Sequence, residues 1–239
     1  MRAIKIKKGR CKMVAHRGLC GLERENTCAS FVAAAVQPYY GIETDVHVTK
    51  DGKFILCHDD NVQRVSGKNL VIEETDFATL RRVKLLDSDG TNKRSDLVLP
   101  TMEDYFSIVK KYNKIAFFEF KNRIAKAKIK EIVEIIKTFG WFKKTVFISF
   151  NKENLIDLRA LEPKAKMQLL SGEYSEELFE FAQTYDTGLD VHYKLINEEF
   201  ITKAHAFGIK VNAYVVNEKE MAEAFVKDGL DYITTNILI

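Results

Sequence analysis

The sequence has little of what divides a chain into parts. Its 239 residues include 3 prolines, 12 glycines and no stretch rich in Pro, Gly or Ser. We find no low-complexity tract and no repeat of fixed period, so neither a flexible linker nor a solenoid is indicated. Hydrophobic residues make up 46% of the chain, enough for one large core. We therefore expect a single domain spanning residues 1–239.

Paired cysteines, long apolar runs and a strong charge imbalance are also absent. The four cysteines form no CxxC motif, and a chain of this length needs no disulfides. No apolar run approaches the roughly 18 residues of a membrane span, and Phe31 to Val36 is too short and too late for a signal peptide. The net charge of +3 is spread along the chain, which argues against nucleic acid as a partner. These features predict a cytoplasmic protein with no stable membrane insertion.

The first twelve residues are an exception, with six basic side chains and no acidic one. A solvated arm is the simplest interpretation, and attraction to anionic lipid or phosphate is the alternative.

Strand-like apolar runs alternate with helical periodicity along the whole chain. We predict eight strands, at 12–15, 41–49, 114–121, 145–149, 166–170, 189–192, 209–216 and 230–234. Helices are predicted at 101–112 and 124–139, behind Ser175, and from an Asn217 cap to Lys227. Eight strands with intervening helices in about 250 residues predict an α/β fold, a (β/α)₈ TIM barrel. No GxGxxG follows any strand, so a doubly wound Rossmann sheet has no support.

Two segments depart from a plain barrel. A short strand, 54–57, follows an Asp-Gly hairpin turn, and a small charge-rich insertion at about 61–99 comes after it. We expect this insertion to fold over the mouth of the barrel. The chain also stops five residues after the eighth predicted strand, which leaves little room for a closing helix.

Polar side chains occur where predicted strands end, which is where barrel enzymes place their active sites. Glu43 and Asp45 share one strand face at roughly 6.6 Å, close enough for both to reach one cation. An ordinary polar strand face is the alternative. Glu119 and Lys121 share a face of the next strand, with a surface ion pair as the alternative.

The remaining candidate groups also follow apolar runs. His16 and Arg17 come after the first strand, and His58 comes after the hairpin strand. Three carboxylates suit a hard divalent cation such as Mg²⁺ or Ca²⁺, with Mn²⁺ possible, better than zinc. A cation with Arg and Lys suits a phosphate, and two imidazoles supply a base and an acid. The chemistry indicated is phosphodiester cleavage.

The same residues resemble the glycerophosphodiester phosphodiesterase family. The matching motifs run in order through His16-Arg17-Gly18, Glu25-Asn26-Thr27, Glu43-x-Asp45, Asp51-Gly52, His58-Asp59, Pro100-Thr101-Met102, Glu119-x-Lys121, Tyr214-Val215-Val216-Asn217 and Ile233-Thr234-Thr235-Asn236. The resemblance covers nearly the whole chain. Arg24 stands where the family usually has proline, Tyr214 replaces a usual tryptophan, and Leu238 stands near a common proline.

The resemblance implies a role for each matching residue. His16 and His58 would be the catalytic acid/base pair, and Glu43, Asp45 and Glu119 would bind one divalent cation. Arg17 and Lys121 would hold the phosphate, and Tyr214 would contact the substrate. The family's substrates are glycerophosphodiesters, the deacylated esters of phospholipid head groups. Their own glycerol hydroxyl would attack phosphorus, and water would open the cyclic phosphate to glycerol 3-phosphate and an alcohol.

Two other functions remain open at this stage. Phospholipase D-like enzymes that cleave intact or lyso-phospholipids are similar in fold and histidine pair, and a non-catalytic phosphodiester-binding barrel is a further alternative. Of the other histidines, His47 is either near the metal face or simply packed in its strand. We expect His192 at the pocket and His205 in a structural role.

Overall fold

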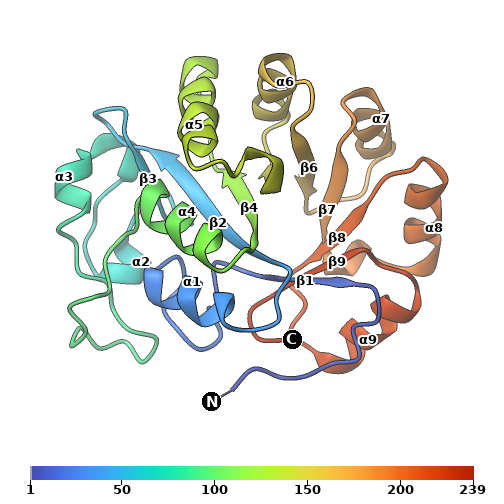
Figure 1. Cartoon of the computed structure of the whole chain (residues 1–239), viewed down its shortest axis with the longest axis horizontal. Helices are drawn as coiled ribbons and strands as arrows, with labels where there is room; N and C mark the ends of the chain where they lie inside the picture. Colours follow the sequence, from blue (N-terminus) through green and yellow to red (C-terminus); the bar gives the residue numbers. More distant parts are fainter. Residues whose placement is uncertain (1) are drawn as a thin grey trace.

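The computed structural model describes residues 2–239, and its centre is a closed barrel of eight parallel strands (Figure 1). Each strand pairs with its neighbours in the order β1-β9-β8-β7-β6-β5-β4-β2, and β1 pairs with β2 to close the barrel. The predicted TIM barrel is therefore confirmed. The barrel strands are β1 (Lys12–Ala15), β2 (Gly41–Val48), β4 (Ile115–Phe120), β5 (Thr145–Ser149), β6 (Lys166–Ser171), β7 (Gly188–His192), β8 (Val211–Tyr214) and β9 (Tyr232–Thr235).

Helices follow the strands and cover the outside of the barrel (Figure 1). Their apolar stripes pack against the outward side chains of the strands, because parallel strands are buried on both faces. Thr27 and Thr101 begin α1 and α4 with reciprocal capping boxes. The helices are α1 (Cys28–Ala35), α4 (Met102–Lys111), α5 (Lys126–Thr138), α6 (Lys152–Leu161), α7 (Glu176–Thr184), α8 (Glu198–Ala206) and α9 (Lys219–Lys227), with short 3₁₀ turns η2 (Phe142–Lys144) and η3 (Tyr193–Leu195).

One predicted cap is wrong. Helix α9 begins after Glu218 rather than Asn217, and no side chain caps it. The Asn217 amide oxygen instead accepts hydrogen bonds from the Thr235 hydroxyl at 3.2 Å and the Asn236 backbone N–H at 2.9 Å. Asn217 thus ties the end of β8 to the end of β9, close to the mouth of the barrel.

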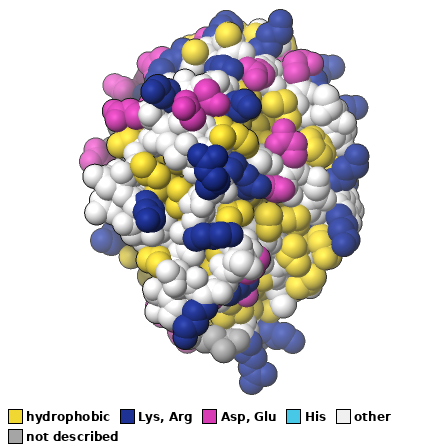
Figure 2. Space-filling view, turned by 90° about the vertical axis from the view of Figure 1, so that its left-hand side faces the viewer, with side chains coloured by type: hydrophobic (Ala, Val, Ile, Leu, Met, Phe, Trp, Pro, Cys, Tyr) yellow, Lys and Arg dark blue, Asp and Glu magenta, His cyan; other side chains and the backbone are white. Residues whose placement is uncertain are grey.

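The insertion lies beside the barrel rather than over its mouth, so that expectation is wrong (Figure 1). Strand β3 (Phe54–Leu56) pairs antiparallel with β2, and α2 (Gln63–Ser66), η1 (Ile72–Glu74) and α3 (Phe77–Leu80) follow. These pieces share a small hydrophobic core that includes Ile55, Val65 and Leu80. Because Ile55 belongs to β3, and Val65 and Leu80 belong to the insertion, this shared core holds the insertion against the β3 side of the barrel. Figure 2 shows this face, where basic and acidic side chains alternate with smaller hydrophobic patches.

The segment around Ile4 lies beside the last residues of the chain, from Ile237 to Ile239. Ile4 and Ile239 exchange backbone hydrogen bonds with each other's segments, including Ile239 N–H to Ile4 C=O at 2.8 Å. Leu238 is fully buried in the outer core. The backbone of the basic first segment is therefore hydrogen-bonded to the last residues of the chain, while most of its side chains remain exposed. Within the described residues, every helix falls short of the length and apolarity needed to cross a bilayer.

The first βα loop depends on one glycine. Gly18 has φ +77°, and a Cβ there would lie 2.4 Å from Ser30 Oγ at the start of α1. Gly67 has a similar φ of +72°, but a Cβ there would meet nothing within 4 Å. Position 18 therefore has both a conformational and a packing constraint, whereas position 67 has only the first.

We predict that Gly18→Ala lowers the free energy of unfolding by about 3 kcal/mol. Roughly 1–2 kcal/mol comes from the left-handed backbone, and roughly 1–3 kcal/mol comes from overpacking. Gly67→Ala, the matched control, should lose only the first contribution. Urea unfolding of both variants measures the difference, and equal losses would contradict the close approach of α1 to this loop.

Candidate active site

A cavity of about 250 Å³ opens at the carboxyl ends of the barrel strands. Six of the eight predicted site residues line it: His16, Arg17, Glu43, His58, Glu119 and Tyr214. Asp45 and Lys121 do not line the cavity, but they contact its charged wall through Glu119 and Arg17. The structure thus brings together all eight residues, which lie between 16 and 214 in the sequence.

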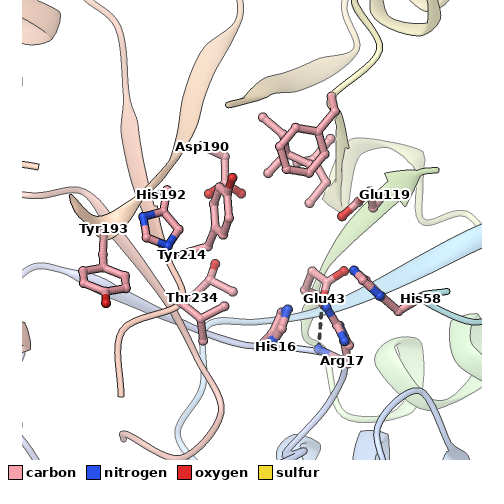
Figure 3. A pocket seen from close by; sticks show the side chains of 14 residues that line it. His16, Arg17, Glu43, His58, Glu119, Asp190, His192, Tyr193, Tyr214 and Thr234 are labelled. Carbon is pink, nitrogen blue, oxygen red and sulfur yellow. Dashed lines mark hydrogen bonds between the residues drawn. The ribbon is translucent and has the colours of Figure 1, made fainter. Parts of the chain in front are cut away.

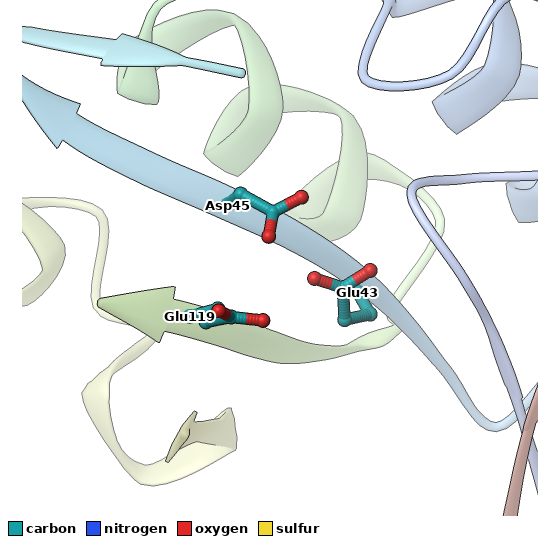
Figure 4. Close-up of side chains that lie close together, drawn as sticks. All are labelled: Glu43, Asp45 and Glu119. Carbon is teal, nitrogen blue, oxygen red and sulfur yellow. The ribbon is translucent and has the colours of Figure 1, made fainter. Parts of the chain in front are cut away.

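Three buried carboxylates lie together at the charged wall, and two of them, Glu43 and Glu119, line the cavity. Glu43 and Asp45 lie on β2, and Glu119 lies on β4, where it is in register with Asp45 (Figure 4). One oxygen from each lies within 4.8 Å of the others. Their side chains converge because β2 and β4 are hydrogen-bonded neighbours whose inward positions face the same interior.

Two cations hold this group in place. Lys121 Nζ lies 2.7 Å from Glu119 Oε1 and 3.4 Å from Asp45 Oδ1. Arg17 donates its backbone N–H to Glu43 Oε2 at 2.7 Å, and its Nε lies 3.7 Å from Asp45 Oδ2. The Asn26 amide also donates to Asp45 Oδ2 at 2.7 Å. Asp45 is therefore the best-compensated carboxylate of the three.

The pKa values follow this distribution of charge. Burial raises the pKa of Glu43 well above its usual range, and the negative charges of Asp45 and Glu119 add to the rise. Burial and Asp45 likewise raise the pKa of Glu119, to about 8. Burial pushes the pKa of Asp45 upward too, but Lys121 and Arg17 outweigh it and hold that pKa well below its usual range. The cluster is short of positive charge.

The shortage of positive charge fits a divalent cation. Glu43 Oε1 is buried and has no hydrogen-bond partner among the described residues. Unpaired buried carboxylate oxygens are costly, and oxygen donors in this number suit Mg²⁺, Mn²⁺ or Ca²⁺. Glu43, Asp45 and Glu119 are therefore the residues that fit a metal, and the chemistry of the donor set does not favour zinc.

The two histidines are oriented by different partners. His16 Nδ1 lies 2.8 Å from Asn236 Oδ1, and His58 Nδ1 lies 2.6 Å from Asp59 Oδ1. With Nδ1–H as the donor in each pair, Nε2 is the nitrogen that takes up or releases a proton in the cavity. Burial, with Arg17 nearby, lowers the pKa of His16 to about 4, so its imidazole is neutral at pH 7.

A chain of ion pairs joins the loops that hold Arg17 and His58. Arg17 Nη1 lies 2.8 Å from Glu25 Oε1, and Arg64 lies 2.7 Å from both a Glu25 and an Asp59 oxygen. Arg64 comes from the insertion, so this segment contributes to the site from its edge. No sequence pattern indicates a role for Arg64. Four further residues occur in the motifs quoted above but had no role assigned to them: Glu25, Asn26, Asp59 and Asn236.

The opposite wall of the cavity is largely aromatic and apolar (Figure 3). Tyr214 packs edge-on against Phe150 at 6.0 Å and His192 at 5.8 Å between ring centroids. His192 lines the cavity, as expected. His47 does not line it, and its Nε2 lies 3.4 Å from the His58 carbonyl oxygen. His205 pairs with Asp231 on the surface, in keeping with a structural role.

The protein has a (β/α)₈ barrel whose strand ends hold a buried carboxylate cluster, two imidazoles and two fixed cations. These features are those of barrel enzymes that act on phosphate esters. Comparison with known families gives the particular one. The family model of the glycerophosphoryl diester phosphodiesterase family matches residues 16–238. The chain belongs to this family, which confirms the sequence prediction, and the enzyme class is phosphoric diester hydrolase.

Individual relatives match this chain over most of their length. A glycerophosphodiester phosphodiesterase from Caldanaerobacter subterraneus is 28% identical over 229 residues, which cover 94% of this chain and 93% of the relative. A phosphodiesterase from Oleispira antarctica, solved in complex with the product sn-glycerol-3-phosphate, is 25% identical with a TM-score of 0.88. That alignment covers 97% of this chain and 95% of the solved one. A lysophospholipase D from Rattus norvegicus is 22% identical over 236 residues, covering 91% of this chain and 74% of the relative.

We predict that Lys121→Met destabilises the metal-free protein by about 3 kcal/mol, because it leaves buried Glu119 without its ion-pair partner and removes the nearer of the two cations beside Asp45. Urea unfolding in EDTA measures this loss. Lys137→Met is the matched control, since Lys137 also contacts two carboxylates, of Glu134 and Glu162, but at the surface. Exposed pairs contribute about 0–1 kcal/mol, so the control should change little. Similar losses in the two variants would show that Lys121 does not offset buried charge.

Proposed function

We propose that this protein hydrolyses glycerophosphodiesters to glycerol 3-phosphate and an alcohol, with one divalent cation bound by Glu43, Asp45 and Glu119. The observation that carries the proposal is the position of His16 and His58 beside this carboxylate group in one cavity. Membership of the family and the product-bound Oleispira antarctica relative support the choice of substrate.

Each histidine has a chemical task in this proposal. His16 is neutral and has its Nδ1 against the Asn236 amide oxygen, so its Nε2 takes the proton from the attacking glycerol hydroxyl. His58 has its Nδ1 against the Asp59 carboxylate. Burial lowers the pKa of His58, and the charge of Asp45 and the hydrogen bond to Asp59 oppose that shift and favour the protonated ring, whose Nε2 gives a proton to the leaving alkoxide. In the second step the roles reverse, and water opens the cyclic glycerol phosphate.

The charged residues place and neutralise the phosphate. Arg17, which lines the cavity, and Lys121, which is paired with Glu119, provide positive charge as negative charge grows on the non-bridging oxygens. The cation, when bound, polarises the phosphate oxygens as a Lewis acid. Tyr214 forms part of the facing wall and limits where the substrate lies. The ion pairs through Glu25 and Arg64 keep the two catalytic loops in register.

The alternative substrate is a lysophospholipid. The rat relative named lysophospholipase D supports including it, and Phe150, which is 51% exposed at the cavity, would tolerate an apolar chain. The cytoplasmic compartment expected from the sequence stays a prediction.

The reaction is tested by release of glycerol 3-phosphate from a panel of glycerophosphodiesters, with lysophospholipids in parallel. We expect EDTA to abolish release and one of Mg²⁺, Mn²⁺ or Ca²⁺ to restore it. Glu43→Gln should stay inactive at excess cation, while Glu131→Gln on the exposed face of α5 should behave as the wild type. Turnover that EDTA leaves unchanged would reject the cation, and turnover of lysolipids alone would reject the substrate class.

His16→Ala and His58→Ala should each lower kcat by about 10²- to 10⁴-fold, the usual contribution of a positioned acid or base. Calorimetry should find cation affinity unchanged, because neither imidazole is among the proposed ligands. His205→Ala is the control, since His205 lies on the surface with Asp231. A variant that keeps wild-type kcat would remove that histidine from the mechanism.

A further inference from the structure

One acidic residue in the cavity has no part in the chemistry described above. Asp190 lies on β7, is 2% exposed, and lines the cavity across from Glu43 and Glu119 (Figure 3). Its Oδ2 accepts a hydrogen bond from the Asn212 amide at 3.0 Å. Its Oδ1 is buried and has no partner, and no Lys, Arg or His of the described chain forms an ion pair with Asp190. A buried carboxyl oxygen without a partner is uncommon in native structures, and at the wall of a cavity a bound ligand is one group that would satisfy it.

The surroundings of Asp190 indicate that the carboxyl group is neutral. Its neighbours in the barrel interior are polar but uncharged, since Asn212 also bonds to Thr234 at 3.0 Å and approaches Gln168 at 3.5 Å. Burial raises the pKa of Asp190 well above the usual range, and the negative charge of Glu119 adds to the rise. A neutral carboxyl whose Oδ2 accepts from Asn212 leaves Oδ1, a buried atom of a residue that lines the cavity, to carry the O–H.

The position of Asp190 decides which part of a substrate it would meet. Asp190 lies in the barrel interior, whereas the half-exposed ring of Phe150 lies at the opening. Every glycerophosphodiester has the same glycerol group, while the alcohol varies and must leave. The enclosed end therefore suits the constant glycerol group, and the open end suits the variable alcohol. Glycerol keeps one primary hydroxyl that neither attacks phosphorus nor is esterified.

We propose that Asp190, as a neutral carboxylic acid, binds the free primary hydroxyl of the substrate's glycerol group and so selects glycerol esters over deoxy analogues. The inference rests on the proposed function and adds a specificity residue to it. A hydroxyl would satisfy Oδ1, whereas an analogue without that hydroxyl would leave a buried polar group unpaired. Sites of this kind discriminate strongly against ligands that lack the matching group.

The test compares two substrates that differ in one oxygen atom. They are a glycerophosphodiester and the matching ester of propane-1,2-diol, which keeps the attacking secondary hydroxyl and lacks the primary one. For the wild type with its cation, we expect kcat/KM to be roughly 10- to 100-fold lower for the propanediol ester. Equal kcat/KM for the two substrates would overturn the inference without any variant. A wild type inactive on both would instead reject the proposed function.

Two substitutions at position 190 identify the residue responsible. Asp190→Asn should keep the discrimination, because its amide NH₂ replaces the acid O–H as donor while its oxygen still accepts from Asn212. Asp190→Leu should reduce the ratio of the two kcat/KM values to within about threefold. We expect Asp190→Leu to fold, since Asn212 keeps Thr234 as a partner. Loss of discrimination in Asp190→Asn would show that the carboxylate is ionised, and full discrimination in Asp190→Leu would exclude Asp190 from recognition.

A control separates recognition from general effects of removing a buried polar atom. Thr187 has a buried hydroxyl with no partner and does not line the cavity. Thr187→Val should therefore leave the ratio of the two kcat/KM values unchanged. A ratio that fell equally in Thr187→Val and Asp190→Leu would mean that the effect is structural.

Discussion

The central constraint in this structure is the close approach of three buried carboxylates. Glu43, Asp45 and Glu119 place oxygens within 4.8 Å of one another inside the barrel, where unpaired charge is costly. Lys121 and Arg17 offset part of that charge, and the Asn26 amide supplies one hydrogen bond. Burial raises the pKa values of Glu43 and Glu119, and the negative charge of Asp45 adds to both rises. The remaining deficit of positive charge accounts for the fit of a divalent cation.

The loops around this cluster are arranged by the same charges. Arg17 is fixed to Glu43 through its backbone and to Glu25 through its guanidinium group. Arg64 then connects Glu25 to Asp59, which holds His58. A displacement of Glu43 would therefore be transmitted to the loops that carry His16 and His58, because each contact along this path is shorter than 3 Å. The insertion matters to the site chiefly because it supplies Arg64, although it lies outside the cavity.

Much of the fold and the charged wall of the site could be predicted from the sequence, because both depend on local patterns. Apolar runs of strand length mark the barrel strands, and alternation within β2 puts Glu43 and Asp45 on one face. Asn236 could not be assigned, because it lies 220 residues from its partner His16 and only barrel closure brings them together. Asp190 looked like an ordinary strand residue, and its unpaired oxygen becomes visible only in three dimensions. The insertion was misplaced because its own small core, which holds it beside the barrel, has no clear periodicity.

The account depends most directly on a cation at the carboxylate cluster. A crystal structure of the protein grown with Ca²⁺, with anomalous scattering to identify the ion, tests this claim. The account predicts one ion at about 2.3–2.6 Å from an oxygen of each of Glu43, Asp45 and Glu119. An ion bound elsewhere, with Glu43 Oε1 still unpaired beside Arg17, would contradict it.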